Sequence, residues 1–205
     1  MKSIFIHTGL TWMLILFGYS IYAQQGLQMY IGYRLDVPTG SFTNQVSNTA
    51  GKGFNAALSY SLNTNLSLGL MVSYNDYYQK YPRAVYTDGQ GTDISAVMTN
   101  SIQQIPIQFV ADYKLLDKGL VQPYVGLGAG FNMVSYDQYL GEFDNPQNAI
   151  RPTFSGDAGI FIPVSKYSPT AIRLGAGYNF TPMNKAGIKD LNSFGFHAGV
   201  RFPLH

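Results

Sequence analysis

Residues of opposite character alternate along most of this chain, and this alternation is what most constrains its fold. In residues 27–37, large apolar side chains take the odd positions, while Gln, Gly, Arg and Asp take most of the even ones. A period of two is typical of β-strands with two different faces. The pattern recurs in seven more segments: 53–62, 66–75, 102–114, 122–134, 152–162, 170–180 and 193–202. The sequence therefore predicts eight β-strands.

The connections between these segments alternate in length. The short ones are 63–65, 115–121 and 163–169, and the long ones, rich in Asn, Gly, Thr, Asp and Gln, are 38–52, 79–100, 135–151 and 181–192. Short turns at one end and long loops at the other are typical of up-and-down membrane barrels. The predicted fold is an all-β, transmembrane, eight-stranded antiparallel up-and-down barrel, with short periplasmic turns and four long extracellular loops.

The alternative is a soluble β-sandwich or lipocalin-like barrel, which would bury its apolar face and expose its polar one. In this chain the polar face consists mostly of Gly, Ser, Asn and Gln, and much of it is too small to cover a protein exterior. The apolar face runs for about ten residues per strand, which is the length that a tilted strand needs to cross a bilayer. We therefore expect the apolar face to contact lipid.

Aromatic side chains on the apolar face gather near the strand ends, where membrane barrels place two interfacial girdles. Toward the long loops lie Tyr33, Tyr74, Phe131, Phe154, Tyr178 and Phe194, and toward the short turns lie Tyr60, Tyr113 and Phe202.

Composition excludes several classes of function. Charged residues make up 12% of the 205 residues, the formal net charge is +2, and there is no cysteine. A nucleic-acid-binding protein would show a basic stripe, so we expect no nucleic-acid partner. Without cysteine, disulfide frameworks and thiolate metal sites are impossible. We expect no cofactor and no metal.

The first 23 residues differ from the rest and are typical of a signal peptide. Lys2 is followed by an apolar run over 10–23, which ends on the small residue Ala23. A membrane-anchoring helix is the alternative, but it needs about 20 apolar residues, and the polar stretch 7–9 interrupts this one. We expect residues 1–23 to be cleaved during export and residues 24–205 to form a single barrel domain.

The polar face carries eight ionisable residues inside the predicted strands. An eight-stranded barrel is only wide enough for side chains to fill it, so these groups should pair with one another as a structural lumen network. Its predicted members are Arg34, Asp36, Asp112, Lys114, Asp157, Arg173, His197 and Arg201. Their near balance of charge does not favour a selective pore.

Pro106 lies in the middle of the segment 102–114. A proline cannot donate a ladder hydrogen bond, and a closed barrel has no open edge to accommodate it. The sequence therefore predicts a local β-bulge at this position.

Four stretches resemble the small outer-membrane β-barrels of Gram-negative bacteria, in particular the porin-like outer-membrane protein β-barrel domain of Bacteroidota. They are the signal ending at Ala23, residues 105–107, residues 122–130 and the closing strand 194–202. The resemblance implies a location in the outer membrane, contact with its lipid, and assembly by the barrel-assembly machinery through the last strand. The recognition signal for assembly in such barrels is a last strand that ends in an aromatic residue, whereas in this chain three residues follow the aromatic Phe202.

Some barrels of this size modify lipid A with a His that is paired to a Ser or an acid, which makes His197 the candidate base. By its parity His197 faces the lumen, and no His-x-Ser-Asn run lies beside it, so we expect a structural role. The function we expect is that of a monomeric, non-enzymatic surface-interaction or envelope-assembly component, acting through its extracellular loops. The alternatives are solvated loops without a partner, a minor channel for small or hydrophobic solutes and, less favoured, a lipid-modifying enzyme.

Overall fold

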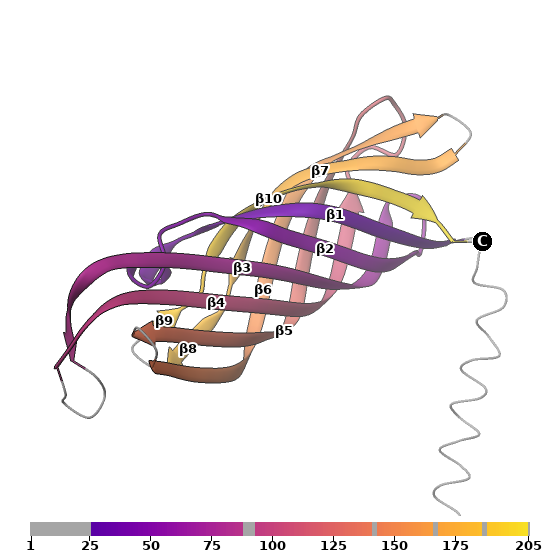
Figure 1. The fold of residues 1–205 in the computed structure, drawn as a ribbon. Coiled ribbons are helices and arrows are strands. Elements are labelled where there is room, and N and C mark those ends of the chain that lie inside the picture. The colour runs from indigo at the N-terminus through magenta and orange to yellow at the C-terminus, as the bar shows by residue number, and fades with distance from the viewer. Residues whose placement is uncertain (1–25, 88–92, 141–142, 166–167, 186–187, 205) are drawn as a thin grey trace, which may run out of the picture.

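The computed structural model describes residues 26–87, 93–140, 143–165, 168–185 and 188–204 (Figure 1). Within these residues, eight strands close into one antiparallel barrel in the order β1-β10-β7-β6-β5-β4-β3-β2, which confirms the predicted fold. No helix in this part of the chain is long and apolar enough to cross a membrane. The signal peptide predicted for residues 1–23 lies outside the described residues.

The barrel strands are β1 (Leu27–Pro38), β2 (Ala50–Ser61), β3 (Leu66–Thr87), β4 (Asp93–Lys114), β5 (Gln122–Leu140), β6 (Phe143–Ser165), β7 (Ser168–Phe180) and β10 (Ser193–Pro203). Three short elements complete the fold: the 3-10 helix η3 (Gly40–Asn44) and the paired strands β8 (Pro182–Lys185) and β9 (Ile188–Asp190). The first and last strands pair with each other, and the Leu204 amide donates to the Leu27 carbonyl at 2.9 Å. We call this end of the barrel the terminal end and the opposite one the distal end.

Burial follows the predicted alternation of faces. On β4, Phe109 is 76% exposed on the outer surface, whereas its neighbour Gln108 is 2% exposed in the lumen. On β5, Leu127 is 73% exposed, whereas Asn132, which faces the lumen, is fully buried. The barrel thus has an apolar exterior and a polar interior, the reverse of a soluble barrel and the arrangement that a lipid environment favours.

The apolar exterior has a defined height. Every outward residue of β5 from Val125 to Met133 is apolar or aromatic, a stretch of about nine residues that fits the hydrocarbon core of a bilayer. Met133 is paired with Ile105 and Ile150, and the next outward row is polar: Gln103, Ser135 and Asn148. The apolar band therefore ends between these two rows.

Two of the predicted long loops are strands, so the predicted boundaries 79–100 and 135–151 are wrong. β3 and β4 stay paired as far as Thr87 and Asp93, and β5 and β6 as far as Leu140 and Phe143. The apolar alternation stops here because the outward face leaves the apolar band, although the backbone ladder continues.

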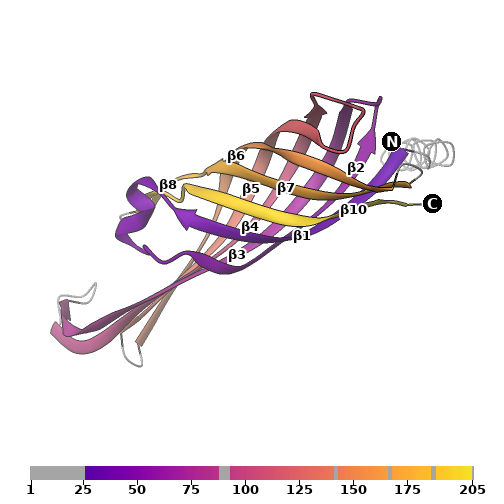
Figure 2. The same ribbon diagram turned by 90° about the horizontal axis from the view of Figure 1, so that it is seen from above.

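The neighbouring strands stop earlier. β2 pairs with β3 only up to Phe54–Tyr74, and β7 pairs with β6 only up to Phe154–Phe180. β3 to β6 therefore continue as a four-stranded sheet beyond the barrel wall (Figures 1 and 2), which we call the distal sheet. It comprises residues 75–87, 93–104, 134–140 and 143–149.

The β-bulge predicted at Pro106 is absent. Pro106 pairs with Asn132 of β5, and the register against β3 is the same on both sides of it, at Val72–Ile107 and at Asn75–Gln104. Pairing with β3 is interrupted for two residues, but β4 contains no extra residue there. The missing N–H of a proline removes a hydrogen bond and does not by itself require a bulge.

The height of the apolar band can be tested by introducing an arginine at an outward position inside the band and, in a second variant, at an outward position beyond it. Leu127→Arg should lower the free energy of unfolding from lipid vesicles by about 2–4 kcal/mol, because Leu127 faces outward within the band. Gln103→Arg, which is also on the outer face but beyond the band, should cost less than about 1 kcal/mol. Urea titrations of both variants in the same vesicles measure the difference, and equal costs would contradict the assigned band.

Candidate functional site

The guanidinium of Arg173 on β7 is the centre of the lumen network. It donates to Asp112 Oδ2 at 2.8 Å, to Asp157 Oδ1 at 2.8 Å and, through Nε, to Tyr124 Oη at 2.9 Å. Arg173 is 6% exposed. Asp112 lies on β4, which is not a sheet neighbour of β7, so this ion pair crosses the lumen rather than following the wall.

His197 joins the same cluster. Its Nε2 lies 3.0 Å from Tyr124 Oη, and its Nδ1 lies 3.5 Å from Asp157 Oδ2. Because Tyr124 Oη already accepts a hydrogen bond from Arg173, the Tyr124 hydroxyl can donate to Nε2, which leaves the ring proton on Nδ1. Nδ1 makes no hydrogen bond among the described residues, so His197 helps to hold Tyr124 beside Arg173 but is not itself fully satisfied.

Glycine makes room for this cluster. A Cβ added at Gly175 would lie 2.6 Å from His197 Nε2 and 2.5 Å from Tyr124 Oη, closer than any side chain allows. Only glycine fits at this position on β7, directly beside the polar groups that it would otherwise displace.

A second ion pair lies nearer the distal end. Arg34 donates to both carboxylate oxygens of Asp36, at 2.5 and 2.9 Å, and Asp36 is fully buried. Ser193 Oγ also donates to Asp36, at 3.3 Å. The two residues face the same side because they are two positions apart on β1, next to an irregularity in its pairing with β2.

The two remaining predicted members lie apart from both clusters. Arg201 stacks on Phe161, with Cζ 3.8 Å from the ring centroid, and Lys114 lies at the end of β4. In the described part of the chain, neither has a carboxylate within ion-pair distance. Sequence reasoning overlooked the lumen aromatics Tyr124 and Phe161, although their parity placed them on the polar face.

The lumen between these clusters holds almost no free space. A cavity of about 20 Å³ lies among Arg34, Asn55, Asp157, Arg173 and His197, and a volume of that size holds about one water molecule. In this structure the space beside His197 therefore has room for about one water molecule.

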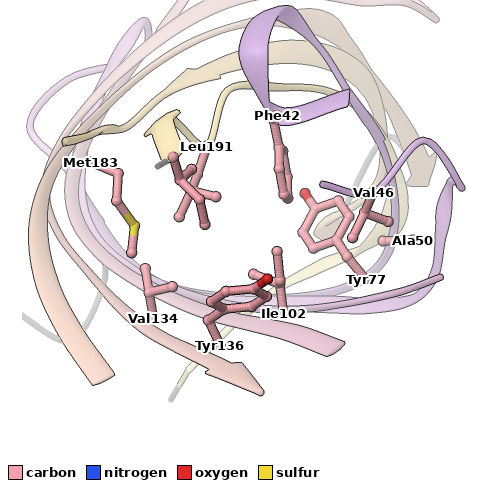
Figure 3. Close-up of a cluster of buried hydrophobic side chains, with 10 residues drawn as sticks. Phe42, Val46, Ala50, Tyr77, Ile102, Val134, Tyr136, Met183 and Leu191 are labelled. Atoms are coloured by element: carbon pink, nitrogen blue, oxygen red, sulfur yellow. The ribbon is translucent and has the colours of Figure 1, made fainter. Parts of the chain in front are cut away.

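The distal mouth of the lumen is filled by a cluster of buried apolar side chains, which we call the apolar plug (Figure 3). Phe42 packs edge-on against Tyr77 with ring centroids 4.8 Å apart, and Met183 and Leu191 approach from the opposite connection. The plug consists of Phe42, Val46, Ala50, Tyr77, Ile102, Val134, Tyr136, Met183, Ile188 and Leu191.

Two predicted loops therefore fold inward. The connections 38–52 and 181–192 supply about half of the apolar plug, and the rest comes from the lumen-facing side of the distal sheet. The signal was present in the sequence, because Phe42, Val46 and Leu191 are apolar residues within otherwise polar segments. What the sequence could not show is that both connections meet over the same opening.

The nine predicted girdle residues all lie on the outer surface. Seven are exposed, and Tyr74 and Phe202 are half-buried. The Tyr33 hydroxyl donates to the carbonyl oxygen of Gly51. Among the described residues there is no group of three or more His, Asp or Glu side chains that could hold a metal ion.

Several solved structures of bacterial surface and outer-membrane proteins have a similar fold. Neisserial surface protein A is 19% identical, with a TM-score of 0.51 over 87% of this chain and 96% of its own. The outer membrane protein OprG of Pseudomonas aeruginosa is 11% identical, with a TM-score of 0.55 over 88% and 96%. The outer membrane protease OmpT of Escherichia coli is 9% identical, with a TM-score of 0.51 over 88% and 97%.

These similarities show that the chain has the fold of outer-membrane β-barrels. No protein-family model and no curated protein matches the sequence. The more specific likeness to the Bacteroidota barrel domain stays a prediction.

Removing the central cation should destabilise the barrel strongly. Arg173→Met leaves Asp112 and Asp157 buried without a counter-charge, and we expect a loss of about 3–5 kcal/mol in the free energy of unfolding. The triple variant Arg173→Met, Asp112→Asn, Asp157→Asn should recover part of that loss. Urea unfolding in vesicles compares the two with Arg83→Met, an exposed control, and a single variant as stable as the control would refute the network.

The apolar plug should govern the order of the distal connections. Leu191→Ala removes a fully buried side chain, and such truncations cost about 2–5 kcal/mol. We expect faster protease cleavage within 181–192 while the barrel remains folded. Leu62→Ala, at an exposed position in the turn after β2, is the matched control and should leave the cleavage rate unchanged.

Proposed function

We propose that this protein is an integral outer-membrane protein, exported through a cleaved signal peptide, which acts without catalysis as a surface-interaction or envelope-assembly component. The observation that carries the proposal is the distal sheet, because four paired strands rise beyond the apolar band over a mouth that the apolar plug closes.

The orientation follows from the termini. The first and last described residues lie at the terminal end, which faces the periplasm when short turns stay inside, so the distal sheet is extracellular. One of the solved structures with this fold is named a surface protein, which is compatible with this orientation.

The outer face of the distal sheet offers a contact surface to a protein partner. Tyr78 on β3 is 54% exposed and Tyr139 on β5 is 40% exposed, and both point away from the apolar plug. Tyrosine supplies a large amphipathic contact area at a low cost in conformational entropy.

Contact through side chains is favoured over strand addition. The distal sheet has two edges. At the β6 edge no further strand of the described chain is paired, and Pro146 lies there, where a proline hinders the addition of a strand. At the β3 edge the connection 38–52 is in contact, because the Asn48 side chain donates to the Tyr78 carbonyl.

The alternative functions have less support. Arg173 and its partners span the lumen, and the apolar plug lies above them, so a channel would need both to move. A lipid-modifying enzyme would need a nucleophile beside His197, whose Nε2 faces Tyr124 instead. The purified protein should therefore show no conductance in planar bilayers, and a steady single-channel current would favour the minor channel.

The surface role can be tested by crosslinking the tagged protein in its native outer membrane and identifying what co-purifies. We expect a defined protein partner whose recovery falls at least tenfold in the double variant Tyr78→Ser, Tyr139→Ser. The double variant Tyr60→Ser, Tyr113→Ser makes the same chemical change at the terminal end and should retain the partner. Recovery of the barrel alone, or equal recovery from both variants, would contradict a contact through the distal sheet.

A further inference from the structure

The terminal end of the barrel holds a pocket of about 720 Å³ whose charge is unbalanced. Of its described lining residues, Lys114, Lys118 and Arg201 are cationic, whereas Asp117 is the single acid. We call it the terminal pocket. It lies at the opposite end from the distal sheet and shares no residue with it.

Arg201 is the buried element of this pocket. It is 6% exposed, its guanidinium stacks on Phe161, and its Nε makes no hydrogen bond. Asp112 attracts Arg201 but is bound directly by Arg173, and among the described residues no carboxylate lies within ion-pair distance of Arg201. A buried cation without a direct ion-pair partner is costly, which points to an anionic ligand.

Two further groups of the pocket lack partners within the described residues. The Gln28 side-chain oxygen is buried and accepts no hydrogen bond. The Lys114 ammonium forms no ion pair there: Arg201 repels it across the pocket, and Asp117 attracts it from beyond ion-pair distance. An anion between Lys114 and Arg201 would turn this repulsion into two attractions.

The donor set suits a phosphate better than a carboxylate. A guanidinium and two ammonium groups can satisfy three or more acceptor oxygens and up to two negative charges, and a lone carboxylate offers only two oxygens and one charge. The Gln28 oxygen can in addition accept from a hydroxyl or ammonium group on the same ligand.

The position of the pocket also fits a phosphate. Lys114 directly follows Tyr113, and Arg201 directly precedes Phe202, both of which belong to the aromatic residues of the terminal end. Such aromatics lie at the level of lipid headgroups. The rim adds exposed apolar side chains, with Leu120 81% and Val164 64% exposed.

We propose that the terminal pocket binds a phosphate group, held between Arg201 and Lys114 with Lys118 at the rim. The group could be carried by the headgroup of a phospholipid in the adjacent leaflet or by a soluble phosphate. Both sources would present the same phosphate group to the pocket, and the experiment distinguishes them.

The test is titration calorimetry of the purified protein in a non-ionic, phosphate-free detergent, with inorganic phosphate, short-chain phosphatidylglycerol or acetate as the probe. We expect saturable binding of a phosphate-bearing probe that weakens with salt. Arg201→Gln should weaken it at least tenfold, and Lys114→Gln several-fold. Arg83→Gln and Lys52→Gln, which remove exposed cations at the distal end, are the matched controls and should bind like the wild type.

The outcomes separate the sources. Binding of phosphatidylglycerol alone assigns a lipid headgroup, and binding of inorganic phosphate assigns the phosphate group itself. No binding of either at millimolar concentration, equal affinity for acetate, or binding unchanged in Lys114→Gln would overturn the proposal. If the Arg201→Gln variant does not fold, the Lys114→Gln variant provides the test, because Lys114 is only half-buried.

Discussion

The structure depends on the closure of its backbone ladder. In a hydrocarbon layer, each unpaired N–H or C=O group costs several kcal/mol, so a sheet can span a membrane only without free edges. Pairing of β1 with β10 over eleven residue pairs, from Gln28–Pro203 to Pro38–Ser193, removes the last two edges. Once the ladder is closed, every strand presents one face to lipid and one to the lumen, and the polarity of all other positions follows.

Closure also creates the problem that the lumen network solves. Eight strands enclose a space that side chains must fill, and the charges there are removed from bulk water. Arg173 pairs with Asp112 and Asp157, and Arg34 pairs with Asp36, so the two clusters hold one more carboxylate than arginine. Arg201 and Lys114 lie at the terminal end, and among the described residues neither has an ion-pair partner.

The two ends of the barrel are therefore specialised in different ways. At the distal end, apolar residues from two connections seal the lumen, and the strands continue as a sheet with tyrosines on its outer face. At the terminal end, a cationic pocket opens at the level of the aromatic girdle. Because the lumen between them is packed, we infer that the protein acts at its two ends rather than through its interior.

The number of barrel strands, their two faces and the polar character of the lumen could be predicted from the residue pattern, because a period of two is a local property that does not depend on how the strands are arranged. The same pattern placed His197 and Arg173 in the lumen, but it could not pair Arg173 with Asp112, 61 residues away. Such cross-lumen partners, the inward fold of Phe42 and Leu191, and the length of β3 to β6 depend on the three-dimensional arrangement of the strands. Contacts across a barrel depend on its closure and shear, and the residue pattern of a single strand predicts neither.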